Sequence, residues 1–221
     1  MDVCCLKYGV WNVQTPDVGA VNALVTGGYA PLTAMVLAAR GLTSPAQAHR
    51  YLACNDPLPS PFEMTDMDLA VGRVRLALSR REKIAVFGDY DVDGITATCL
   101  LTHYLRAQGA DCISYIPGRL EEGYGLNPIA IRQLASDGVG LIITVDCGIT
   151  AVEEAQLCRQ MGIDLVITDH HECKDILPEA VAVVNPHRPD GGYPHMNLSG
   201  VGVAFKLAAA LSGDQQAVLD E

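Results

Sequence analysis

Short apolar runs alternate with helical segments in the last two thirds of the chain. The runs are rich in β-branched residues and apolar on both faces, and they span Ile84–Phe87, Cys112–Ile116, Leu141–Val145, Leu165–Thr168 and Val181–Val184. Segments with helical spacing lie between them at Ile95–Gln108, Pro128–Ser136 and Ala151–Met161. Strands that are apolar on both faces and separated by helices are typical of a parallel sheet. We therefore predict a three-layer α/β domain with a mostly parallel, Rossmann-like sheet.

The stretch that precedes this domain is patterned for helices. Apolar residues follow Pro31 at helical spacing up to Gly41, and Ser44 is a suitable N-cap for a second helix that ends at Leu52. A third helix is predicted from Asp66 to about Arg80. We therefore divide the chain into an N-terminal arm with a small helical region, residues 1–80, and the α/β domain, residues 81–221.

Composition narrows the class of protein only slightly. The 221 residues include 49% hydrophobic ones, and the formal net charge is −11. No segment has the apolar length needed to span a bilayer, and Met1–Val10 does not have the pattern of a signal peptide, so we expect a cytoplasmic protein without a membrane partner. The acidic balance argues against a general nucleic-acid-binding surface, but it does not exclude a nucleic-acid enzyme whose site holds metal cations.

Three carboxylates stand at alternate positions directly after the first strand of the predicted sheet. They are Asp89, Asp91 and Asp93. Close like charges repel and burial adds a desolvation cost, so such a cluster is unfavourable unless a cation neutralises it. Hard oxygen ligands in this number suit Mg²⁺ or Mn²⁺. An acidic turn, or a phospho-acceptor pocket like that of response regulators, would use the same residues, and this motif alone does not decide between them.

Two further strand ends carry polar side chains. Asp146 follows the third strand of the sheet, at the edge where open parallel sheets bind ligands, although it could instead cap the next helix. Asp169, His170 and His171 follow the fourth strand. Neighbouring side chains point different ways there, so one histidine can bind metal while the other faces substrate and Asp169 orients an imidazole. A solvated polar turn is the alternative, but three such clusters favour a site.

The ordered motifs resemble those of the DHH phosphoesterase superfamily. They are Gly88–Gly94 (GDYDVDG), Val145–Gly148 (VDCG) and Asp169–His171 (DHH). Two further segments, Ile116–Asn127 and Leu198–Lys206, narrow the resemblance to the RecJ-type single-strand-specific exonucleases. The resemblance covers nearly the whole chain after about residue 25.

The resemblance implies a role for each matching residue. Two Mn²⁺ or Mg²⁺ ions would be bound in the intact protein, and the ligands implied within this chain are Asp91, Asp93, Asp146 and His170. His171 would contact the scissile phosphate as a catalytic residue together with Asp169, and Asp89 would support the ligands from behind. Arg119 matches an arginine expected to bind a backbone phosphate, with a salt bridge to a neighbouring glutamate as the alternative.

The implied function is 5′→3′ exonuclease activity on single-stranded DNA in recombination and repair, with single-stranded-DNA-binding protein and a helicase as partners. Other members of the superfamily cleave oligonucleotides, cyclic dinucleotides or pyrophosphate, and degenerate RecJ-like proteins are non-catalytic scaffolds. The GDYDVDG form disfavours the first group, and the presence of every matching ligand disfavours the second.

Two departures from the family pattern change what we expect of this chain. Phe87 stands where many relatives carry a histidine ligand, and the family's last ligand aspartate lies beyond Glu221. We therefore expect a C-terminally incomplete domain with little or no activity on its own.

Overall fold

The computed structural model describes residues 5–6, 9–10, 14–53, 57–118, 123 and 125–220. The chain divides into two compact units, Met1–Pro57 and Leu58–Glu221, and each is described by itself.

The first unit contains a short antiparallel hairpin and a small helical cluster. The hairpin pairs β1 (Cys5–Leu6) with β2 (Gly9–Val10), and the helices are α1 (Val18–Thr26), α2 (Pro31–Ala39) and α3 (Pro45–Ala53). Leu24, Ala34 and Leu37 are buried at the centre of the cluster. The helices predicted from Pro31 and from Ser44 are confirmed. The sequence analysis predicts no helix where α1 lies. The residue that could have indicated its start is Asp17, whose carboxylate caps α1 by accepting a hydrogen bond from the Ala20 N–H.

The second unit is built on a parallel sheet, as the sequence predicted. Within the described residues of this unit, five strands run in the order β4-β3-β5-β6-β7, and every neighbouring pair is parallel. The strands are β3 (Lys83–Phe87), β4 (Cys112–Tyr115), β5 (Val139–Val145), β6 (Asp164–Thr168) and β7 (Ala182–Val184).

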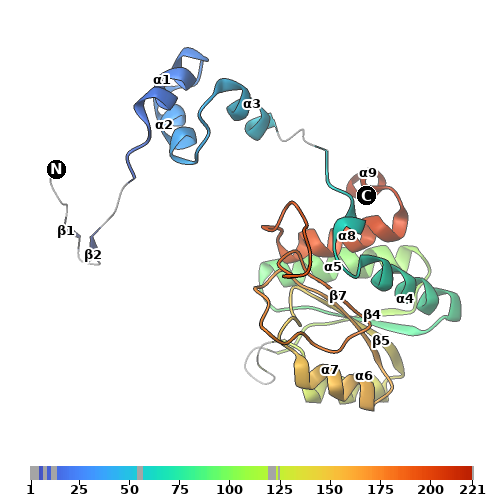
Figure 1. Cartoon of the computed structure of the whole chain (residues 1–221). Helices are drawn as coiled ribbons and strands as arrows, with labels where there is room; N and C mark the ends of the chain where they lie inside the picture. Colours follow the sequence, from blue (N-terminus) through green and yellow to red (C-terminus); the bar gives the residue numbers. More distant parts are fainter. Residues whose placement is uncertain are drawn as a thin grey trace. The chain divides into compact units, whose positions relative to one another are not determined.

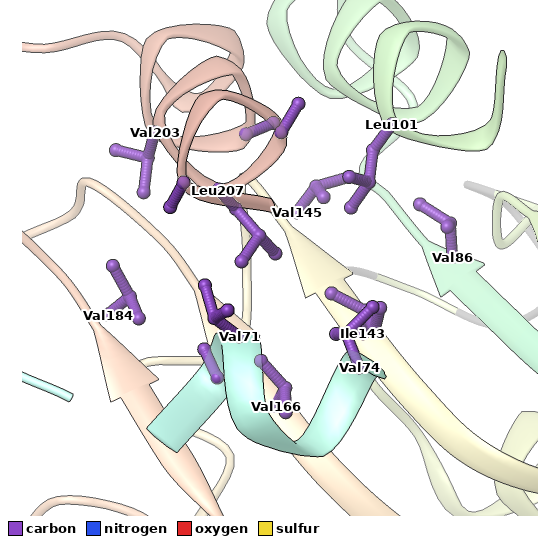
Figure 2. Packing of buried hydrophobic residues seen from close by; sticks show 14 of the residues in the cluster. Val71, Val74, Val86, Leu101, Ile143, Val145, Val166, Val184, Val203 and Leu207 are labelled. Carbon is purple, nitrogen blue, oxygen red and sulfur yellow. The ribbon is translucent and has the colours of Figure 1, made fainter. Parts of the chain in front are cut away.

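Helices cover both faces of the sheet, which completes the three-layer arrangement (Figure 1). One face is covered by α4 (Met67–Arg80), α5 (Val92–Ala107) and α8 (Gly200–Ser212), and the other by α6 (Pro128–Ser136) and α7 (Val152–Gln160). Two shorter elements, the 3₁₀ helix η1 (Pro61–Glu63) and α9 (Gln215–Asp220), pack against α8. Figure 2 shows Leu101 of α5 and Leu207 of α8 meeting Val145 of β5 in the hydrophobic core between the sheet and the helices α4, α5 and α8.

The helix α4 belongs to the second unit. The sequence pattern places Asp66–Arg80 with the helical region that precedes the sheet, whereas the boundary between the compact units lies at Pro57–Leu58. Val71 and Val74 are buried in one core with strand residues such as Ile143 and Val166 (Figure 2). Apolar residues on one side of α4 therefore hold it on the sheet, and its sequence spacing could not show which neighbour would bury them.

A buried arginine adds a polar link between α4 and the sheet. Arg73 donates from Nε to Asp164 and from Nη2 to Glu82, both at 2.5 Å. Its side chain is only 8% exposed, so the two carboxylates compensate a charge that would otherwise be buried alone. The pair of bonds connects α4 to the starts of β3 and β6.

Replacement of this arginine should be costly. We expect Arg73→Ala to lower the free energy of unfolding by about 2–4 kcal/mol, because it removes a buried side chain and both of its ionic hydrogen bonds to Glu82 and Asp164. The matched control is Arg159→Ala, whose ion pair with Glu179 is exposed on both sides and should contribute less than about 1 kcal/mol. Urea denaturation of the two variants gives the comparison, and equal losses would contradict a structural role for the buried pair.

Candidate metal centre

The strand-end residues meet at the carboxyl edge of the sheet. Because β3, β5 and β6 are parallel neighbours, the residues that follow them share one edge. His170 Nε2 lies 3.1 Å from Asp146 Oδ1 and 3.7 Å from Asp93 Oδ2. Three segments that are far apart in the sequence thus bring their ligand-type side chains within direct contact.

Two overlapping groups of side chains could each hold a metal ion. In the first, ligand atoms of Asp89, Asp91 and Asp146 all lie within 4.8 Å of one another. In the second, Asp146, His170 and His171 satisfy the same distance. Among the described residues, Asp146 is common to both groups. The sequence assigned only a supporting role to Asp89, but a carboxylate oxygen of Asp89 is as well placed to bind a metal ion as one of Asp91.

Asp146 is held in an unusual conformation and environment. Its φ of 60° is in the left-handed region, and its side chain is 2% exposed. Burial, followed by the negative charges of Asp93 and Asp91, raises the pKa of Asp146 to about 7. Its buried Oδ1 accepts no well-formed hydrogen bond from any residue that the structure describes, although His170 Nε2 is close. The alternative helix-capping role is wrong, because α7 has Ala151 at its N-cap and no side-chain cap.

Two acidic residues of the first motif accept hydrogen bonds from the first turns of helices. Asp91 is the N-cap of α5 and accepts from the Gly94 N–H at 2.9 Å. Asp93 accepts two backbone hydrogen bonds from the first turn of α8, from Gly200 and Val201, each at 2.7 Å. Nothing in the sequence indicated the second contact, because the donors lie more than a hundred residues downstream and backbone amides have no sequence signature.

Asp169 organises the turn that carries the two histidines. One of its oxygens accepts from the His170 N–H and lies 2.7 Å from His171 Nδ1, while the other accepts from the Ile149 N–H. Burial would raise the pKa of Asp169, but the hydrogen bonds from the His171 side chain and the Ile149 backbone hold it below its usual value. The same carboxylate raises the pKa of His171. Asp169 therefore orients the His171 imidazole, as the sequence predicted.

One residue to which the sequence reasoning gave no role supports this turn from the end of β7. Asn185 is buried at the end of that strand, and its Nδ2 donates to the His171 carbonyl at 2.9 Å. Its polar side chain after an apolar strand was the available signal. Arg119, the predicted phosphate-binding residue, lies outside the described residues.

The chemistry of these donors fits a divalent cation. Carboxylate oxygens with an imidazole nitrogen are ligands that Mn²⁺ and Mg²⁺ accept. The buried Asp146 Oδ1 accepts no hydrogen bond from the described residues, and a bound cation would compensate its charge instead. Without a cation, burial and then the nearby charges of Asp93 and Asp91 disfavour the ionised form of Asp146 and raise its pKa. The residues present therefore fit the metal ions that the resemblance implies.

The sequence is similar to curated exonucleases over most of its length. It is 44% identical to the single-stranded-DNA-specific exonuclease RecJ of Bacillus subtilis (strain 168) over 206 residues, which is 92% of this chain and 26% of that protein. It is 38% identical to the RecJ exonuclease of Escherichia coli (strain K12) over 182 residues, which is 82% of this chain and 31% of that protein. The chain thus spans between a quarter and a third of the length of these relatives.

Solved structures of exonucleases have the same fold. A structure of exonuclease RecJ bound to manganese is 37% identical, with a TM-score of 0.62 over 71% of this chain and 38% of that one. A structure of RecJ in complex with Mn²⁺ from Thermus thermophilus is 27% identical, with a TM-score of 0.67 over 91% of this chain and 28% of that one.

The family model for the N-terminal domain of the DHH family matches residues 83–220. The match begins at the first residue of β3 and includes the whole sheet and all three strand-end clusters. The chain belongs to the DHH family.

Proposed function

We propose that this chain is the catalytic domain of a two-metal phosphodiester hydrolase, a RecJ-type exonuclease that degrades single-stranded DNA in the 5′→3′ direction during recombination and repair. The observation that carries the proposal is the convergence of Asp91, Asp146 and His170 from three strand ends, with Asp146 common to two potential ligand groups. The relatives named as single-stranded-DNA-specific exonucleases support the substrate, and the manganese-bound structures support the cofactor. The activity is proposed for the longer protein that would include this domain.

Five side chains of this edge are proposed to hold the metal ions: Asp89, Asp91, Asp93, Asp146 and His170. Asp146 has the place expected of a ligand shared by two ions, because it is the member common to both groups of described residues. Bound Mn²⁺ or Mg²⁺ would supply Lewis acidity toward the phosphate and a water molecule of lowered pKa. The protein's own contribution is a rigid donor set at the end of a buried sheet.

His171 is proposed to bind the scissile phosphate. Its Nδ1 lies 2.7 Å from Asp169 Oδ1, and this contact fixes the orientation of the ring that is proposed to meet a substrate oxygen. In the metal-free chain, the hydrogen bond with Asp169 raises the pKa of His171. Its side chain is 49% exposed, whereas Asp169 beneath it is 1% exposed, so the imidazole faces the side from which substrate arrives.

The cellular setting is proposed from the same resemblance. We infer a cytoplasmic location and single-stranded DNA as the macromolecular substrate, with single-stranded-DNA-binding protein and a helicase as the partners that would expose it. In the part of the chain that the structure describes, every helix is too short or too polar to cross a bilayer. Arg119 remains the proposed contact for a backbone phosphate.

Removal of the charge on Asp146 should stabilise the metal-free protein while abolishing its response to metal. The folded-state pKa of Asp146, about 7, is above the ordinary value of 3.8. The stability that the protonated carboxyl group contributes to the folded chain is therefore fully present below about pH 4 and is lost as the pH rises through 7. Asp146→Asn should therefore raise the metal-free melting temperature at pH 8 more than at pH 5. It should also eliminate the increase that Mn²⁺ produces in the wild-type chain.

Circular dichroism melts at both pH values, with and without Mn²⁺, measure these changes. Asp175→Asn removes an exposed carboxylate and serves as the control, for which we expect a normal metal response. A variant at Asp146 that is destabilised equally at both pH values, or that retains the Mn²⁺ response, would show that this carboxylate is neither electrostatically strained nor a ligand.

The two histidines should differ in their response to metal concentration. In the longer protein, His170→Ala should weaken metal binding and recover part of its activity at high Mn²⁺, because mass action restores occupancy. His171→Ala should leave metal affinity nearly unchanged and lower turnover by roughly a hundredfold, because more metal cannot replace a contact made in the transition state. Turnover on a 5′-phosphorylated single strand across a Mn²⁺ series separates these outcomes. Rescue of His171→Ala instead would reverse the two assignments.

A further inference from the structure

The first turn of α8 lies directly on the acidic cluster. The opening amide groups of a helix have no partner within the helix and carry its partial positive charge. In α8 the amide groups of Gly200 and Val201 donate to the two oxygens of Asp93, each at 2.7 Å, and the Gly202 amide donates to the N-cap hydroxyl of Ser199 at 3.2 Å. The positive end of α8 is therefore directed at a carboxylate that we place in the metal centre.

Gly200 permits this approach because it has no side chain. A Cβ at this position would lie 2.2 Å from Asp146 Oδ1 and 2.5 Å from the Asp146 Cβ, which are distances that real atoms do not adopt. At Gly202, two residues further along the same helix, an added Cβ would meet nothing closer than 3.4 Å. The two glycines of the Ser-Gly-Val-Gly segment therefore differ, and only the first is required by contact with Asp146 across the site.

The rest of α8 anchors this turn firmly. Along its length α8 packs on α5 and α4, with Val203 and Leu207 in the core shared with the sheet (Figure 2). The buried ammonium group of Lys206 donates to the Pro59 carbonyl at 2.8 Å and to Gln215 Oε1 at 2.6 Å. A helix fixed at so many points holds its first turn, and hence the carboxylates that touch it, in a defined position.

We propose that the first turn of α8 is a positioning element of the metal centre, in which Gly200 and Val201 fix Asp93, and the bare backbone of Gly200 leaves the space in which Asp146 is held. This inference rests on the proposed metal-binding function and extends it to residues that contact no ion. A consequence is reciprocal coupling: binding of a cation by the acidic cluster stabilises the docked first turn of α8, and displacement of that turn weakens cation binding.

The test is a comparison of two glycine-to-alanine variants in one helix. Mn²⁺ binding by the 221-residue chain is measured calorimetrically for the wild type, Gly200→Ala and Gly202→Ala. Gly200→Ala should weaken Mn²⁺ affinity by about tenfold or more, the usual effect of disturbing the residues behind a metal's ligands. Gly202→Ala should bind like the wild type, because its new methyl group has room.

Double variants distinguish an effect through Asp93 from general loosening of the helix. If the turn acts in part through this carboxylate, Gly200→Ala should weaken Mn²⁺ binding less in an Asp93→Asn background than in the wild type, and the remaining effect is that of the new Cβ on Asp146. A purely structural glycine would lower the melting temperature without changing Mn²⁺ affinity, and additive effects on affinity in the double variant would likewise overturn the proposal.

A measurement on the wild type covers the case in which Gly200→Ala does not fold. Amide hydrogen exchange of residues 200–203 should slow when Mn²⁺ is added, while the amides of α6, on the far face of the sheet, should be unaffected. Unchanged exchange in α8 with Mn²⁺ bound would overturn the coupling and leave the proposed function intact. A wild-type chain that binds no Mn²⁺ would overturn both.

Discussion

Repulsion among carboxylates at the carboxyl edge of the sheet is the constraint on which the rest of the second unit depends. Asp89, Asp146 and Asp169 are buried there, and Asp91 and Asp93 lie close by. A parallel sheet makes this crowding unavoidable, because each strand delivers its next residue to the same edge. The fold tolerates the charge because it provides most of these carboxylates with compensating groups of their own.

The compensation is mostly supplied by the backbone. Asp91 and Asp93 accept from the first turns of α5 and α8, and Asp169 accepts from Ile149, His170 and its neighbour His171. Asp146 differs from Asp91, Asp93 and Asp169, since its buried Oδ1 receives no such bond from the described residues. This uncompensated oxygen is on the residue that belongs to both potential ligand groups. This is the arrangement expected where a function requires a cation and the fold alone does not supply one.

Much of this architecture could be predicted from the sequence, for reasons that differ between elements. Apolar runs such as Leu141–Val145 identify strands buried on both faces, and the ligand-type residues after them had to converge once the sheet was parallel. The position of α4 could not be predicted, because the spacing of its apolar residues does not show which neighbour buries them. The hydrogen bonds from the first turn of α8 to Asp93 could not be predicted either, because they depend on backbone amides and on the close approach that a glycine at position 200 permits. The place of Asp89 beside the ligand-type carboxylates also escaped prediction, because alternation along a motif does not show which carboxylates face one another.

If Asp146 is the shared ligand of a cation site formed by residues from three strand ends, the ion itself can be located. Crystals of the chain grown with Mn²⁺ and measured at the manganese absorption edge would place each ion by its anomalous signal. We predict an ion with Asp146 and His170 among its ligands, at manganese–oxygen and manganese–nitrogen distances of about 2.0–2.3 Å, typical of first-row divalent ions in such sites. Asp93 should remain bonded to the first turn of α8. Manganese bound elsewhere on the acidic surface, with this edge of the sheet empty at saturating concentration, would contradict the assignment of Asp146.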